Sequence, residues 1–381
     1  LKKMFEKLLQ KYQSNAKIKQ VAGLLSVNII SIPLSVITSI IITRFLGPAN
    51  YGSFKFILNL FSLATVIFTF GFFQAGNRAL VLNSDTHKAR ELFGAELVIA
   101  GFLFLFYGIS LSGYAFFDHN VNEKGLRLVL LLAIPFSWVF LMSKYFEVLF
   151  QADNKIKLLA KARLFPYLIY FVIILFLYYF LMDYSGNRLV LILGSYFAGN
   201  IAVAIYIIIK INPSFRNFRE RAKEIYHYNK LYGFNVYIGS LFAVGFSQLT
   251  GILISYFSSD NSGVGYYSLA MTIAGPLAFI PNVIATTHYK DFSTSDRVSR
   301  KLLNITLAIS FAALLGAILL VGPFVRIFYG SEFAPVIKLT YIVSFGVLLN
   351  GLGDFFNRFL GSHGEGKALR NSAFIVGLSI I

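Results

Sequence analysis

Few side chains in this sequence could support metal or thiol chemistry. Cysteine is absent, which excludes a thiol nucleophile, a disulfide and a cysteine metal site. The histidines are scattered, with no spacing typical of a metal site: His87, His119, His227, His288 and His363. A metal centre is therefore not expected.

Isolated charges within apolar stretches are the remaining candidates. Glu96 and Asp354 each interrupt such a stretch, and a carboxyl group there can bind a proton or a cation. We predict both as candidates for ion coupling. Lys144 and Glu147 lie three residues apart, as in an ion pair on one helix face, and we interpret that pair as structural.

The composition indicates that these charges are carried by membrane helices. Hydrophobic residues make up 57% of the 381 residues and charged residues 13%, against roughly 45–50% and about 25% in soluble domains. A soluble enzyme, a disordered regulator and a secreted disulfide scaffold are therefore excluded. The remaining class is an all-α polytopic membrane protein.

Apolar runs of about 20 residues, long enough to cross a bilayer, recur along the whole chain. They are continuous and do not alternate as barrel strands do. Ten complete spans are predicted, near 21–43, 53–77, 92–117, 126–150, 164–182, 189–209, 232–256, 263–286, 302–325 and 335–359. An eleventh begins near 371, so we expect the C-terminal part to be incomplete.

The net charge of +17 is distributed unevenly over the predicted loops. Most of the 34 Lys and Arg residues fall in the N-terminal segment and in every second loop. Basic residues accumulate on the cytoplasmic side of membrane proteins, which predicts a cytoplasmic N-terminus. The excess charge thus marks topology and contact with anionic lipid, and nucleic acid is not an expected partner.

Three short matches indicate an internal repeat at an offset of roughly 210 residues. The segment 38–46 resembles 250–258, 51–54 resembles 264–267, and 145–150 resembles 355–360. We predict two six-helix lobes related by a pseudo-twofold axis along the membrane normal. The predicted boundaries are 1–210 for the first lobe, 211–231 for an amphipathic linker on the cytoplasmic membrane surface, and 232–381 for the incomplete second lobe.

Polar side chains follow one face of the first and second spans and recur in the seventh and eighth. Asn28, Ser31, Ser35 and Thr38 form one such stripe. Hydroxyl groups in membrane helices can join helices or bond to their own backbone. Four repeat-related stripes nevertheless favour a hydrated central cavity.

The turn after the first span resembles a known family. The residues are Ile42-Thr-Arg-Phe-Leu-Gly-Pro-Ala-Asn-Tyr-Gly-Ser-Phe54, followed by Gly71-Phe-Phe-Gln-Ala-Gly-Asn-Arg78 and by 356–367 near the end of the tenth span. Together with the topology and the repeat, they are similar to the polysaccharide-transporter (Wzx-like) flippases. This family belongs to the multidrug/oligosaccharidyl-lipid/polysaccharide (MOP) superfamily.

This resemblance implies a flippase that moves a polyprenyl-pyrophosphate-linked oligosaccharide to the outer leaflet by alternating access, without catalytic residues or a cofactor. It implies a bacterial or archaeal cytoplasmic membrane, contact with membrane lipids, and partnership with polysaccharide polymerase machinery. Arginine binds phosphate bidentately, so Arg44, Lys55 and Arg78 become the candidates for pyrophosphate contact. The candidates for sugar contact are Asn28, Asn59, Ser240 and Asn282.

Three alternatives stay open. A peptidoglycan lipid-precursor flippase handles a cargo with the same pyrophosphate group. A cation-coupled multidrug exporter of the same superfamily would carry carboxylates in its central cavity, and spans one, two, seven and eight have none. A membrane-embedded glycosyltransferase or polymerase is disfavoured because the loops are short and poor in acidic residues and histidine.

Overall fold

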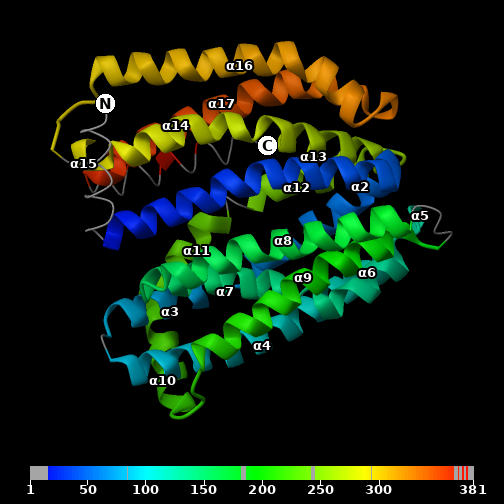
Figure 1. The fold of residues 1–381 in the computed structure, drawn as a ribbon. Coiled ribbons are helices and arrows are strands. Elements are labelled where there is room, and N and C mark those ends of the chain that lie inside the picture. Colours follow the sequence, from blue (N-terminus) through cyan, green and yellow to red (C-terminus); the bar gives the residue numbers. More distant parts are fainter. Residues whose placement is uncertain are drawn as a thin grey trace.

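The computed structural model describes residues 16–83, 85–181, 186–241, 245–292, 294–363, 368, 371, 372 and 375. In this part of the chain there is no strand, and helices run along one common direction (Figure 1). They are α2 (Ala16–Phe68), α3 (Phe72–Val81), α4 (Thr86–Phe117), α5 (His119–Glu123), α6 (Arg127–Ala133), α7 (Trp138–Ala152), α8 (Ile156–Phe180), α9 (Arg188–Ile211), α10 (Phe218–Tyr228), α11 (Phe234–Ser240), α12 (Phe246–Tyr256), α13 (Ser262–Ala274), α14 (Pro276–Thr287), α15 (Tyr289–Phe292), α16 (Arg300–Phe328) and α17 (Pro335–Ser362).

The all-α polytopic class is confirmed. Among the described residues, seven helices are long and apolar enough to cross a membrane, and α6 with α7, bent by 41°, would make an eighth. The number is below ten partly because α2 contains the first and second predicted spans. The seventh is broken into a π-turn (Asn229–Gly233), α11 and α12. The predicted eleventh span lies almost entirely outside the described residues.

Gly47 divides α2 into two arms. Its backbone has φ 70° and ψ 175°, a conformation that favours glycine, and Pro48 follows it. A straight helix of 53 residues would measure about 80 Å, far beyond a hydrocarbon core of about 30 Å. The chain reverses at Gly47, so α3, which continues the second arm, lies at the end of the molecule where α2 begins (Figure 1).

The two ends of the bundle differ in charge. The basic end, at the left of Figure 1, holds the start of α2, together with α3, α10 and α15. The far end, at the right, holds α5 and the turn at Gly47. The loops that the charge pattern placed on one side of the membrane therefore gather at one end of the fold.

The helices form two groups joined through α2. The N-terminal group comprises α3 to α9, and the C-terminal group comprises α12 to α17; α2 packs against α8 and α9 of the first and α12 and α13 of the second. One apolar core runs through both groups, from Ile42 and Phe61 to Val264 and Val325. The predicted twofold relation between the lobes stays a prediction.

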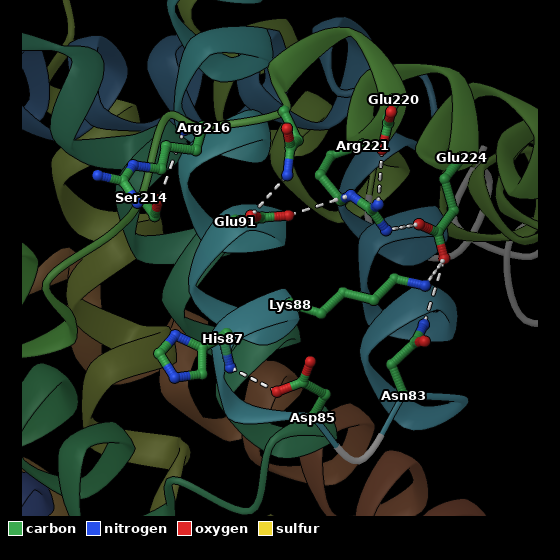
Figure 2. Close-up of polar contacts among 11 residues, drawn as sticks. Asn83, Asp85, His87, Lys88, Glu91, Ser214, Arg216, Glu220, Arg221 and Glu224 are labelled. Atoms are coloured by element: carbon green, nitrogen blue, oxygen red, sulfur yellow. Dashed lines mark hydrogen bonds and ion pairs between the residues drawn. The ribbon is translucent and has the colours of Figure 1, made fainter.

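Ion pairs hold the helix α10, which follows the N-terminal group in the chain, against α3 and α4 of that group. Arg221 is the centre of this cluster (Figure 2): it lies 3.4 Å from Glu91 of α4 and 2.7 Å from Glu224. Glu224 also contacts Lys88 at 3.1 Å and accepts a hydrogen bond of 3.2 Å from the Asn83 amide. Only 14% of the Arg221 side chain is exposed, so these contacts are sheltered from water. The segment is thus docked on α3 and α4 at the basic end.

Replacement of Arg221 by Ala should release α10 from the bundle. The change leaves Glu91 and Glu224 close together without their shared cation, at a cost of about 1–3 kcal/mol for the local contact. Trypsin cleavage after Arg216 and Lys223, two sites that both variants keep, is expected to become about tenfold faster. Arg219→Ala is the matched control, because Arg219 is exposed on the same helix. Equal cleavage rates in the two variants would contradict this role for Arg221.

Candidate functional site

A cavity of about 350 Å³ lies between the second arm of α2 and the helices α7, α8 and α9, with one residue, Gln248, contributed by α12. Its wall contains three ionisable groups of opposite sign, Lys144 and Glu147 from α7 and Arg163 from α8. Uncharged polar side chains complete the lining: Ser62, Thr65, Ser143, Tyr167, Tyr170, Tyr196, Asn200 and Gln248.

The three charges form one ion cluster. The Lys144 ammonium lies 2.9 Å from Glu147 Oε2, and the Arg163 guanidinium lies 2.9 Å from Glu147 Oε1. Each carboxylate oxygen therefore has a cation of its own. All three side chains are 35–38% exposed, which leaves them accessible from the cavity. With two cations and one anion, the cluster carries a net positive charge.

A second cavity, of about 490 Å³, lies between the helix groups. Its wall combines Ser31 and Ser35 of α2 with Asn282 of α14 and with Asp354 and Arg358 of α17. Arg358 donates a hydrogen bond of 3.1 Å to the Asn282 amide oxygen. Tyr167 lines both cavities, so they are neighbours. Their linings lie in the middle and basic-end parts of the helices.

The far end is closed by polar contacts among α2, Lys124 at the end of α5, and residues of the C-terminal group. The Asn261 amide donates to Ser53 at 3.0 Å, and Ser255 donates to the Asn261 amide oxygen at 2.7 Å. Lys124 contacts the same oxygen at 3.2 Å, and burial lowers the pKa of its ammonium group. Ser39 and Tyr329 share a buried hydrogen bond of 2.8 Å. These contacts, with the two from Arg44 described below, form what we call the far-end latch.

Two glycines allow the backbones to touch at this latch. A Cβ atom on Gly52 would lie 1.7 Å from the Asn261 carbonyl oxygen, and one on Gly265 would lie 2.7 Å from the Pro48 carbonyl oxygen. Both distances are far below van der Waals contact. Gly52 of the sequence motif is therefore needed for the close packing of α2 on α13.

The structure does not bring Arg44, Lys55 and Arg78 together. Arg44 donates hydrogen bonds of 2.8 and 2.9 Å to the Phe328 and Ile327 carbonyls at the end of α16. Lys55 lies 5.4 Å from the centre of the Tyr51 ring. Arg78 is exposed at the basic end, roughly 30 Å along the helix from Lys55 at about 1.5 Å per residue. Their contact with pyrophosphate stays a prediction.

The predicted sugar-contact residues also separate. Asn282 lines the second cavity, whereas the Asn59 amide packs on α12, 2.1 Å from where a Cβ of Gly251 would be. Ser240 donates to its own helix, to the Tyr237 carbonyl at 2.8 Å. Asn28 lies in α2, but its side chain is outside the described part of the structure. Their contact with sugar stays a prediction.

The two candidate ion-coupling residues have contrasting surroundings. Glu96 is fully buried in the N-terminal group against Gly76, and its carboxyl oxygens have no hydrogen-bond partner among the described residues. Asp354 is exposed and lines the second cavity. Of the two, Asp354 is the one that water in a cavity can reach. Their role in ion coupling stays a prediction.

Arg163 and Arg358 were not among the site residues predicted from the sequence. Arg163 precedes the predicted span 164–182 and Arg358 lies at the end of the span 335–359, but α8 begins at Ile156 and α17 continues to Ser362, so both arginines stand inside helices. Lys144 and Glu147 form the predicted ion pair, and they also line a cavity. The signal for the cluster was available: α7 and α8 are joined by a short turn, which makes them antiparallel neighbours.

Arg44→Ala should weaken the far-end latch without changing cargo affinity. The guanidinium neutralises carbonyls at a helix C-terminus, a favourable position for a cation, and its loss favours opening by about 1–2 kcal/mol. We expect a several-fold drop in transport and an unchanged Kd for pyrophosphate. Arg326→Ala, an exposed residue of the same helix end, is the control. A weaker Kd in Arg44→Ala would instead support the pyrophosphate contact predicted from the sequence.

This fold and its cavities define a class: a polytopic helical membrane transporter whose polar cavities lie within and between two helix groups. The sequence matches the family described as "Polysaccharide biosynthesis protein" over residues 18–289. The chain therefore belongs to this family of polysaccharide biosynthesis proteins. A search of curated proteins found no match.

Two solved structures have the same fold. One is "Lipid II flippase MurJ, inward closed conformation", with 15% identity and a TM-score of 0.69, aligned over 93% of this chain and 79% of the other. The second is an inward-facing MATE family multidrug resistance transporter of the MOP superfamily, with 14% identity and a TM-score of 0.58, over 94% and 88%. By their titles, one neighbour is a flippase and the other a multidrug resistance transporter.

Proposed function

We propose that this protein flips a polyprenyl-pyrophosphate-linked oligosaccharide across the cytoplasmic membrane for surface polysaccharide synthesis. The observation that carries the proposal is the placement of Lys144, Arg163 and Arg358 on membrane helices around two adjoining cavities. Charged groups within spans are costly and are retained for function. Here cations outnumber the two lining carboxylates, Glu147 and Asp354, which suits an anionic headgroup.

We assign phosphate binding to the cations of the first cavity and sugar binding to uncharged polar and aromatic residues of both cavities. Arg163 offers guanidinium donors and Lys144 a point charge, the two kinds of group that bind phosphate. Uncharged polar side chains that line the cavities, Ser62 and Asn200 in the first and Asn282 in the second, can bond to sugar hydroxyls. The aromatic rings of Tyr170 and Tyr196, 5.6 Å apart, add an apolar surface for sugar faces. The polyprenyl tail stays in the lipid.

The distribution of contacts supports alternating access. The far-end latch joins the helix groups on one side of the cavities, and Gly275-Pro276, between α13 and α14, offers a point of bending within the C-terminal group. Opening the latch and closing the basic end would present the cargo to the opposite leaflet. With the basic end in the cytoplasm, as the positive-inside rule requires, the direction is outward.

Complementation tests this proposal. The gene is expressed in a bacterial strain that lacks its O-antigen or capsule flippase, and surface polysaccharide is measured. Restored polysaccharide is the expected result. Restored drug efflux without polysaccharide would overturn the proposal in favour of a multidrug exporter.

The peptidoglycan-precursor flippase is the second candidate, because the fold resembles that of a lipid II flippase. Its cargo contains the same pyrophosphate and would use the same cations. Rescue of a strain depleted of its lipid II flippase, without rescue of surface polysaccharide, would favour this candidate.

A further inference from the structure

We propose that Glu147 is a resident counter-anion, which occupies the phosphate position in the first cavity and must be displaced by the pyrophosphate of the cargo. This inference rests on the proposed function of the cavity as the cargo site. It assigns Glu147 a role in regulating occupancy, in place of a purely structural ion pair.

The geometry of the cluster carries the inference. One carboxylate joins two cations from different helices, Lys144 of α7 and Arg163 of α8, each at 2.9 Å and each through its own oxygen. A phosphate group also presents several oxygens that can join two cations in this way. Glu147 therefore makes the contacts that a phosphate would make, from the wall of the same cavity.

The exposure of the cluster makes exchange feasible. The side chains of Lys144, Arg163 and Glu147 are about one-third exposed, and ion pairs in contact with water contribute little net stability. A ligand with two charged phosphates can therefore compete with a single carboxylate. Once displaced, Glu147 has open cavity to enter, where Ser143, Asn200 and Gln248 offer polar contacts.

A resident counter-anion also explains how two cations can lie side by side on membrane helices before the cargo binds. Without it, Lys144 and Arg163 would repel one another and would retain any passing anion. With it, only an anion of higher charge gains by entering. This selects a pyrophosphate over an ordinary phospholipid headgroup with one phosphate.

The test compares Glu147→Gln with the wild type, using the purified full chain in nanodiscs. Binding of inorganic pyrophosphate, undecaprenyl pyrophosphate and phosphatidylglycerol is measured by thermophoresis. Glu147→Gln keeps the shape and one acceptor but removes the competing charge. We expect both pyrophosphate ligands to bind about tenfold more tightly, and selectivity over phosphatidylglycerol to fall.

Two controls complete the design. Glu147→Asp keeps the charge and should show no gain in pyrophosphate affinity, and Glu332→Gln, at the far end, should bind as the wild type. A melting temperature confirms folding of each variant. Unchanged or weaker pyrophosphate binding in folded Glu147→Gln would overturn the inference, as would an equal gain in Glu147→Asp.

The outcomes also separate this inference from the proposed function. If Glu147→Gln binds inorganic pyrophosphate more tightly and undecaprenyl pyrophosphate does not bind at all, the counter-anion role of Glu147 is supported and the proposed cargo is overturned. If the wild type binds undecaprenyl pyrophosphate and Glu147→Gln binds it no more tightly, the proposed cargo is supported and the counter-anion role of Glu147 is overturned.

Discussion

A triple variant with Lys144→Met, Glu147→Gln and Arg163→Met should fold normally and lose transport by about 100-fold or more. Each lost contact between a cation and a phosphate is worth about 1.5–3 kcal/mol, and a factor of ten corresponds to about 1.4 kcal/mol. The measurement is surface polysaccharide in a flippase-deficient strain, with membrane expression of the variant quantified in parallel.

The triple variant removes the cations without leaving an unpaired charge. A change of Lys144 and Arg163 alone would strand Glu147, and a stranded charge destabilises the fold for reasons unrelated to cargo. Methionine replaces the aliphatic stems of Lys and Arg with an unbranched, flexible apolar chain, so most of the packing of the cavity wall is kept. A failure to accumulate in the membrane would therefore not be expected.

Lys161→Met is the matched control. Lys161 lies on α8 two residues before Arg163, where its ammonium contacts the Tyr206 hydroxyl at 3.2 Å and does not line either cavity. It carries the same charge at a similar depth, so a general effect of charge on insertion would appear in both variants. Equal loss of transport in Lys161→Met, or full transport in the triple variant, would contradict the assignment of the cavity.

Gly52→Leu should abolish transport by preventing closure of the far end. Even the first atom of the new side chain would lie 1.7 Å from the Asn261 carbonyl oxygen, which is part of the backbone and cannot swing aside. Overpacking of this kind costs about 1–3 kcal/mol or more. The conflict exists only while α2 and α13 are in contact, so the open state escapes it.

The absence of cysteine offers a direct readout of this change. Ser39→Cys places a thiol at the buried contact with Tyr329, where it is protected while the far end is closed. In the Gly52→Leu background, a membrane-impermeant maleimide should label this thiol at least about tenfold faster, since a shift of 1.4 kcal/mol in the gate equilibrium is a factor of ten.

Gly113→Ala is the control for the loss of a membrane glycine, because nothing lies within 4 Å of its added Cβ. It should leave both transport and labelling unchanged. Two results would contradict a role for the far-end latch in transport. One is normal transport by Gly52→Leu. The other is equal protection of the Ser39→Cys thiol with and without Gly52→Leu.

Sequence reasoning predicted most of the fold, because apolar length and loop charge are local properties of the chain. The helices α4, α9, α13 with α14, and α16 lie close to the predicted spans. The extent of the helices beyond the apolar runs was harder to predict. Arg163 stands well inside α8, where polar cavity lining interrupts the apolar pattern that marks a span.

The residues of the candidate site were also predicted only in part. Asn282 was predicted for sugar contact and Asp354 for ion coupling, and both line the second cavity, although their roles stay predictions. Arg44 was predicted to contact pyrophosphate because of its place in a motif. In the structure its guanidinium donates to backbone carbonyls of α16, nearly 300 residues away in the chain. A motif indicates that a residue type is needed at a position, but it does not say which distant backbone that residue meets.

The sequence by itself determined that this chain crosses a membrane many times, where the turns fall, and which end is basic, because burial in lipid imposes length and charge rules on each segment separately. Only the tertiary structure decided which charges share a cavity. Lys144, Glu147 and Arg163 meet because α7 and α8 pack side by side, and Arg358 lines the adjoining cavity because α17 packs on α14. Electrostatic contact depends on distances of a few ångströms in space, and spacing along the chain does not specify those distances.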